Sequence, residues 1–180
     1  MSSNAIQDLE SAIRLNATVA KVHHVENRLS PSSISSQCEY LIRPNQLPAV
    51  VEDLRQAASE AAWAVFMFRT TTPSTETTDD CLNLQFAIER GAVGLEWVLL
   101  GPRNIADKEA LTKFICRRKQ KVEAREMNGV AYLRVEEGDL IDLGLSIVND
   151  FYGVASDYAM GLLVHGFLPH IIESRGRHGH

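Results

Sequence analysis

Few residues of this 180-residue chain stand in a pattern that could do chemistry, and Arg103 and Asn104 are the first candidates. They end the segment Gly101-Pro102-Arg103-Asn104, which follows an apolar run typical of a strand and precedes a helical pattern. Ligands of open α/β sheets sit at the carboxyl ends of strands, and an arginine there can hold a carboxylate or a phosphate. A pocket at this point would indicate a small-molecule enzyme or sensor. The interpretation we favour is a strand–helix turn in which Asn104 caps the helix.

Acidic residues form the other candidate set. Carboxylates bind divalent cations, and they also steer a basic partner toward an acidic surface. The Thr-rich segment 70–80 lacks the Asp-x-Asp-x-Asp-Gly spacing of a calcium loop, so we expect a solvated loop there and no metal. The chemistry that we retain is the binding of a protein partner. Its candidate residues are Glu76, Asp79, Asp80, Glu136 and Glu137.

Sequence patterns that carry catalysis or cofactor binding are missing. Gly91-Ala92-Val93-Gly94 lacks the Gly-Lys-Ser/Thr of a phosphate loop, and neither Gly-x-Ser-x-Gly nor His-Glu-x-x-His occurs. Cys38, Cys81 and Cys116 have no Cys-x-x-Cys spacing, which favours reduced thiols in a reducing cytoplasm. We therefore expect no cofactor, no metal and no enzymatic activity. A triad assembled in space would leave no such pattern, so this expectation rests on motifs alone.

Basic residues cluster between positions 113 and 121, where they suit either a phosphate-binding patch or the negative end of a helix. No aromatic residues interleave on the polar side to stack bases, so we favour the helix end. The net charge of −5 and the pI near 5.7 argue against nucleic acid and anionic membranes as partners. No apolar run reaches the roughly 20 residues of a membrane span, and we predict no secretory signal. A cytoplasmic protein with a basic protein partner is the expectation.

The elements that would position these residues belong to an α+β domain. We expect it over residues 38–172, preceded by an N-terminal helical arm over 1–29 and a Ser-rich linker over 30–37. Residues 173–180 form a basic, His-containing tail that we expect to be disordered. Within the domain, alternating and continuous apolar runs predict a mixed sheet of about six strands with helices packed on it.

One hairpin can be predicted in register. Asn128-Gly129 is the preferred pair for a two-residue type I′ turn, and counting back from it pairs Met127 with Val130 and Glu123 with Arg134. The apolar positions then share one face, which we assign to the core, and Glu123 faces Arg134 on the other side. The predicted core positions are Val122, Ala124, Leu133 and Val135.

Two C-terminal helices are expected. The first begins at Gly138-Asp139 and ends at Gly153. The second covers 156–168, is capped by Ser156 and stopped by Pro169, and has so little polar surface that it is either buried or an interface. An oligomeric structural subunit, joined through the N-terminal helix or through helix 156–168, is therefore one functional hypothesis.

The hypothesis that we place first is a non-enzymatic protein-binding protein. In its length, acidity, α+β pattern and lack of catalytic motifs, the chain is similar to small bacterial immunity proteins, which neutralise toxins by binding them. No motif carries this resemblance, so it implies no site residue. A toxin-neutralising or regulatory role ranks first, a small-molecule enzyme or sensor with a pocket near Arg103 and Asn104 comes second, and an oligomeric subunit is the third.

Overall fold

A computed structural model describes residues 38–70 and 81–171, without the side chains of the first two. The predictions of a helical arm over 1–29, a linker over 30–37 and a tail over 173–180 lie outside the described residues. So do the candidate residues Glu76, Asp79 and Asp80.

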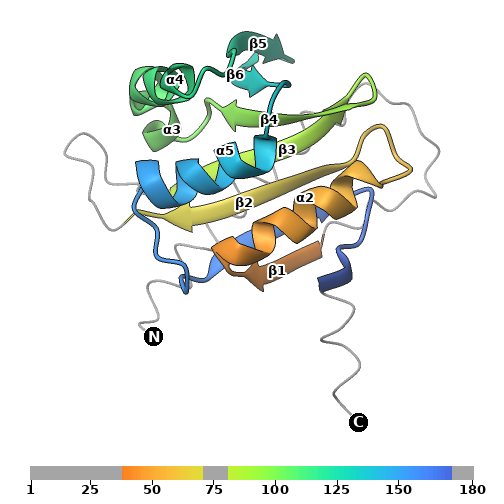
Figure 1. Cartoon of the computed structure of the whole chain (residues 1–180). Helices are drawn as coiled ribbons and strands as arrows, with labels where there is room; N and C mark the ends of the chain where they lie inside the picture. The colour runs from red at the N-terminus through yellow and green to blue at the C-terminus, as the bar shows by residue number, and fades with distance from the viewer. Residues whose placement is uncertain (1–37, 71–80, 172–180) are drawn as a thin grey trace.

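The described residues form an α+β fold built on a seven-stranded sheet (Figure 1). The strand order is β1-β7-β2-β3-β4-β6-β5, and every neighbouring pair is antiparallel. The strands are β1 (Cys38–Ile42), β2 (Trp63–Arg69), β3 (Cys81–Glu89), β4 (Ala92–Val98), β5 (Glu123–Met127), β6 (Val130–Val135) and β7 (Met160–His165).

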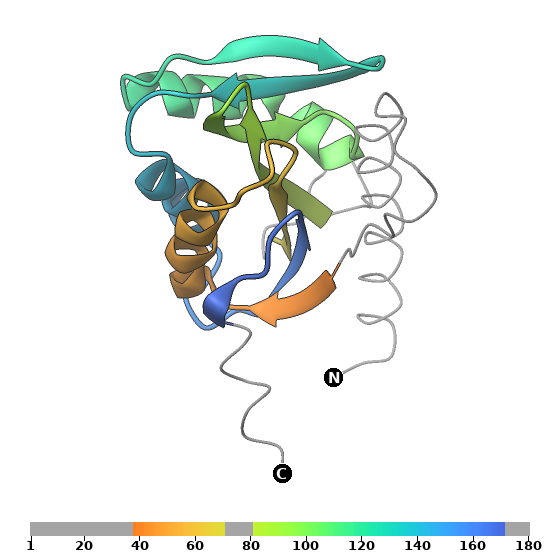
Figure 2. The same cartoon turned by 90° about the vertical axis from the view of Figure 1, so that its right-hand side faces the viewer.

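Two helices, α2 (Leu47–Arg55) and α5 (Leu140–Ser146), lie over one face of this sheet (Figures 1 and 2). In α2 the apolar residues recur at helical spacing, and Leu47, Val50, Val51 and Leu54 are fully buried. Helix α5 begins where predicted, since the carboxylate of Asp139 accepts hydrogen bonds from the first-turn backbone. It continues into a π-helical turn over Ile147–Phe151. The short α3 (Pro102–Ala106) and α4 (Lys108–Arg117) follow β4.

The main core lies between these helices and the sheet. Its centre is aromatic: the ring of Trp97 is fully buried and stacks on Tyr152 with 5.7 Å between ring centroids, and Phe66 meets Phe86 edge to face. Fully burying a side chain of this size contributes about 1.5–3 kcal/mol. The inward positions of β2, β3 and β4 therefore hold both helices in place.

Two tight hairpins set the register on one side of the sheet. Arg90-Gly91 and Asn128-Gly129 have positive φ at both positions, as a type I′ turn requires. The predicted pairing of Met127 with Val130 and Glu123 with Arg134 is confirmed. In the first hairpin the turn is confined to Arg90-Gly91, because β4 begins at Ala92 and Gly94 lies inside it.

The sheet differs from the prediction in two respects: it has seven strands, and all of their pairings are antiparallel. The predicted helix 156–168 is wrong, because residues 160–165 form β7, inserted between β1 and β2. A short apolar run looks the same in a covered strand and in a buried helix, so periodicity cannot separate them. Of the two alternatives predicted for this segment, buried or an interface, the structure shows burial, with a neighbouring strand on each edge. The proposed oligomerisation helix is therefore an interior strand.

The faces of the second hairpin also differ from the prediction. Leu133 and Val135 do belong to the main core, but Ala124 is exposed at the sheet edge. Arg134, which we expected on a solvated face, is 1% exposed. The second face of the sheet is therefore covered around this arginine.

Candidate functional site

The second face of the sheet carries a row of polar side chains on three neighbouring strands. Gln85 on β3 pairs in register with Glu96 on β4, and Glu96 pairs with Arg134 on β6. Directly opposed residues of neighbouring strands point to the same face, so the three side chains lie in line across the sheet. Their exposed fractions are 4%, 0% and 1%. Buried polar groups of this kind need partners within the protein.

The row supplies most of these partners itself. Gln85 Nε2 donates to Glu96 Oε2 at 2.6 Å, and Arg134 Nη1 donates to the other oxygen of the same carboxylate. Arg134 also donates from Nη2 to the carbonyl of Ala92 at 3.1 Å. Burial raises the pKa of Glu96 to about 7, since the nearby Arg134 offsets only part of the desolvation and Glu89 adds to it.

A second arginine extends the network toward solvent. Arg125 Nη1 donates to Glu89 at 2.8 Å and to Glu136 at 2.9 Å, and Arg134 Nε donates to the same Glu136 oxygen at 2.7 Å. The hydroxyl of Tyr132 donates a hydrogen bond to the carboxylate of Glu89 at 2.9 Å. Arg125 also pairs with Glu123, which Lys121 contacts in turn, so three cations face the four carboxylates of Glu89, Glu96, Glu123 and Glu136. This leaves an excess of negative charge when Glu96 is ionised.

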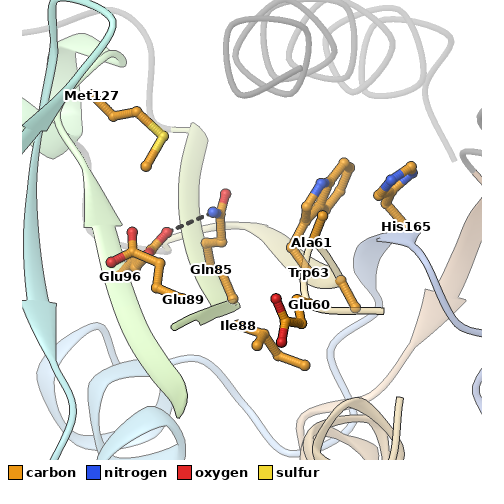
Figure 3. A pocket seen from close by; sticks show the side chains of 11 residues that line it. Glu60, Ala61, Trp63, Gln85, Ile88, Glu89, Glu96, Met127 and His165 are labelled. Atoms are coloured by element: carbon orange, nitrogen blue, oxygen red, sulfur yellow. Dashed lines mark hydrogen bonds between the residues drawn. The ribbon is translucent and has the colours of Figure 1, made fainter. Parts of the chain in front are cut away.

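A cavity of about 180 Å³ opens beside this row, between β4 and the β2–β7 pair (Figure 3). Trp63 stands between His165 and Gln85, and its ring stacks on His165 with 5.5 Å between centroids and 21° between the planes. Carboxylates approach the cavity from both sides. The described lining residues are Glu60, Ala61, Ala62, Trp63, Gln85, Ala87, Ile88, Glu89, Glu96, Met127 and His165.

Two acceptors of the cavity are free of protein partners among the described residues. Gln85 uses its Nε2 on Glu96, and its Oε1 accepts no hydrogen bond from the described part of the chain. Glu60 is exposed and forms neither a hydrogen bond nor an ion pair with a described residue. The cavity therefore offers hydrogen-bond acceptors and negative charge to whatever enters it.

The size and composition of the cavity limit its chemistry. Pockets for small-molecule ligands and cofactors have volumes of about 300–1,000 Å³, so this cavity suits a single side chain or a small ion. Among its described lining residues there is no Ser, Thr or Cys that could act as a nucleophile. Glu96 has a pKa that suits proton transfer, but both of its oxygens are held by Gln85 and Arg134.

The structure places Arg103 and Asn104 in α3, apart from this cavity. Arg103 Nε donates to Asp107 at 2.6 Å, and its side chain is only 11% exposed. Asp107 also accepts from the hydroxyl of Tyr152 at 3.0 Å, so this ion pair fastens the α3–α4 junction to the core. Arg103 therefore already holds a carboxylate, which belongs to its own chain.

Asn104 is fully buried, and it does not cap the helix; Gly101 occupies that position. Its Nδ2 donates to the carbonyl of Val98 at 2.9 Å and to both oxygens of Asn83 at 3.2 Å. Its backbone carbonyl accepts from Trp97 Nε1 at 3.0 Å. These contacts tie α3 to the ends of β3 and β4.

The acidic candidates that the structure describes are not alike. Glu136 accepts from both arginines of the network, and these contacts hold its pKa below the usual range. Glu137 is exposed.

The predicted basic segment sits at the end of α4, where Arg118 pairs with Asp150 at 2.7 Å and lies over the ring of Phe114.

Sequence reasoning missed the cavity residues. Gln85 and Glu96 lie within apolar runs whose periodicity indicates ordinary strands. One signal was available: Glu96 stands inside the apolar run 95–100, and a charged residue in a covered strand is rarely buried without a partner. Its partners come from positions 85 and 134, which only the strand pairing reveals.

In residues 38–70 and 81–171, no group of three or more His, Cys, Asp or Glu residues is arranged to hold a metal ion. No helix in the same ranges is long and apolar enough to cross a membrane. Comparison of the chain with protein-family models, curated proteins and solved structures finds no significant match.

Proposed function

We propose that the chain is a non-enzymatic protein-binding protein whose partner is basic, with a toxin-neutralising or regulatory role in the cytoplasm. The observation that carries this proposal is the cavity beside the Gln85–Glu96–Arg134 row. It combines carboxylates with a free amide oxygen and an aromatic wall, and it is too small for a cofactor. The net charge of −5 supports the same choice, since it attracts cationic partners at long range.

The contact surface in this proposal consists of the cavity and the exposed acids near it. Glu60 is the free carboxylate at the cavity, and Glu137 is an exposed acid just after β6. Charges at the rim of an interface act mostly on the association rate and are screened by salt. A basic partner should therefore bind fast at low ionic strength and more slowly as salt is added.

The test is capture from the host at physiological salt, followed by mass spectrometry and by kinetics with the purified candidate. We expect a near-stoichiometric basic protein whose association rate falls about tenfold or more between 0.05 and 0.5 M salt. Glu60→Lys should weaken its binding. The matched control is Glu52→Lys, on α2 over the opposite face, where Glu52 forms only an exposed ion pair with Arg55. A partner whose binding ignores both salt and Glu60→Lys would contradict the proposal.

A further inference from the structure

The free polar atoms of the cavity are acceptors. Gln85 is 4% exposed, and its Oε1 lines the cavity without a hydrogen-bond donor from the described residues. This oxygen can therefore accept a hydrogen bond from a donor that enters the cavity. Glu60 adds two further acceptor oxygens that no described residue contacts. An occupant that satisfies this cavity must therefore carry several N–H donors.

The charge around the cavity selects a cation. Glu60, Glu89 and Glu96 line it, whereas the two arginines of the network contact their carboxylates from the side of β5 and β6. A positive charge inside the cavity would neutralise the excess negative charge that remains after Arg125 and Arg134 have paired with their carboxylates. Burial raises the pKa of Glu96 to about 7, and the nearby carboxylate of Glu89 adds to this shift.

The stacked rings of Trp63 and His165 favour a planar guanidinium group over a compact ammonium group as the bound cation. Trp63 has His165 stacked on one side and Gln85 on the other (Figure 3). A guanidinium group stacks on aromatic rings and donates in its own plane to carboxylate and carbonyl oxygens, whereas an ammonium is a compact, strongly hydrated charge. The network repeats this preference internally, since Glu89, Glu96 and Glu136 all hold guanidinium groups.

The volume matches one side chain. The cavity volume of about 180 Å³ lies below the roughly 300–1,000 Å³ of pockets for small-molecule ligands. This is enough for the guanidinium and part of the alkyl stem of an arginine, and too little for a nucleotide or a folded peptide. Interface hot spots are often arginines that fill desolvated pockets of this kind.

We propose that this cavity is the docking site for one arginine side chain of the partner protein, stacked on Trp63 and hydrogen-bonded to Gln85 Oε1 and the carboxylate of Glu60. This inference rests on the proposed function, because it names the group through which a basic partner is recognised.

The first test uses three peptide-like probes: N-acetyl-arginine methylamide, its uncharged citrulline analogue and N-acetyl-lysine methylamide. Each is titrated into the ¹⁵N-labelled full chain. The chain has two tryptophans, and the indole of Trp97 is buried and bonded to Asn104, so its resonance is an internal reference for that of Trp63. We expect the arginine probe to shift the Trp63 indole and to bind about tenfold or more tighter than the citrulline analogue, since a hydrogen bond to a charged group is worth about 1.5–3 kcal/mol.

Variants locate the effect. Glu60→Gln keeps the shape of an exposed side chain and should weaken the arginine probe severalfold, while Glu52→Gln on the opposite face should leave it unchanged. Equal binding of the arginine and citrulline probes would overturn the inference. So would lysine binding as tightly as arginine, or a Trp63 resonance that no probe moves.

Failure of this inference can be distinguished from failure of the proposed function. If a basic partner binds the wild-type chain and Glu60→Gln equally well, the cavity is not its anchor, although the protein-binding function stands. If no basic partner binds while the arginine probe does, the cavity recognises a guanidinium group and the proposed function is wrong.

Discussion

The guanidinium group of Arg134 lies in the space that a side chain at Gly94 would occupy. A Cβ built on Gly94 would come 2.6 Å from Arg134 Nε and from Nη2. Gly94 lies two residues before Glu96 on β4, so both point toward the same face of the sheet. The missing side chain of one strand thus makes room for the buried cation of the next.

The first prediction concerns this glycine. Gly94→Ala should lower the free energy of unfolding by about 2–4 kcal/mol, because the added methyl group pushes Arg134 away from Glu96 and leaves buried charges poorly paired. Urea denaturation measures the loss. The control is Gly101→Ala, since Gly101 is also buried, has φ −73°, and would place its Cβ 3.7 Å from the nearest side-chain atom. Equal effects of the two substitutions would contradict the packing argument.

The second prediction concerns pH. The carboxyl group of Glu96 has a pKa of about 7 in the folded chain and 4.5 when solvated. Between these values the folded state keeps a proton that the unfolded state has released, so stability falls as the pH rises from about 5 to 8. The expected loss is on the order of 3 kcal/mol.

Glu96→Gln should flatten this slope, because the amide does not titrate. The comparison with wild type isolates Glu96 from the histidines, which titrate in the same range in both proteins. The groups that face Glu96 are Gln85, Arg134 and Glu89, and they remain in the variant. Chemical denaturation at pH 5, 6, 7 and 8 gives both profiles. Parallel profiles would show that Glu96 titrates normally.

The third prediction tests the coupling of the buried pair. Arg134→Met should cost about 3–5 kcal/mol at pH 8, since buried Glu96 loses its cation and must either stay charged without it or take up a proton. Adding Glu96→Gln should recover more than about 1 kcal/mol of this loss, as expected for residues in one network. Arg125→Met is the milder control, because Arg125 is 24% exposed and solvent replaces its contacts. Additive single effects would exclude the coupling.

How far the sequence could predict this fold depends on which signals were local. The Asn128-Gly129 turn, the helix start at Asp139 and the apolar stripe of α2 are encoded within a few residues, and the turn and the helix start were predicted. Strand β7 was not, because a short and mostly apolar run does not reveal whether its backbone partners lie four residues away or on β1 and β2.

The candidate site was hidden for the same reason. Gln85, Glu96 and Arg134 are ordinary polar residues in their own segments, and they become a buried row only when β3, β4 and β6 pair. Arg103 and Asn104 show the opposite case: they drew notice as neighbours in the chain, but their contacts lie within α3 and its junctions with the core.

The fourth prediction distinguishes the two interpretations of Asn104. If it serves the fold, Asn104→Ala should cost about 1–3 kcal/mol, since the carbonyl of Val98 loses its donor in a buried place. Asn104→Asp should cost more, because it sets a carboxylate against carbonyl oxygens. Thermal and urea unfolding measure both, with the 54% exposed Ile105→Ala as the neighbouring control. A stable Asn104→Ala protein that fails to bind its partner would restore the ligand-binding interpretation.

The fifth prediction separates the two acids that follow β6. Glu136→Lys should destabilise the fold by about 1–2 kcal/mol even after solvent screening, because its carboxylate joins Arg125 to Arg134 and a lysine would add a third cation. Glu137→Lys should change stability by less than about 0.5 kcal/mol, since the residue is exposed.

The same pair of variants gives a clean test of the acidic surface. Reversal at Glu137 removes surface charge without disturbing the network, so any fall in the association rate with a basic partner reports on recognition. Reversal at Glu136 mixes recognition with folding, and its binding data must be read beside its unfolding curve. If Glu137→Lys unfolds early while Glu136→Lys does not, the arginine network has been assigned to the wrong carboxylate.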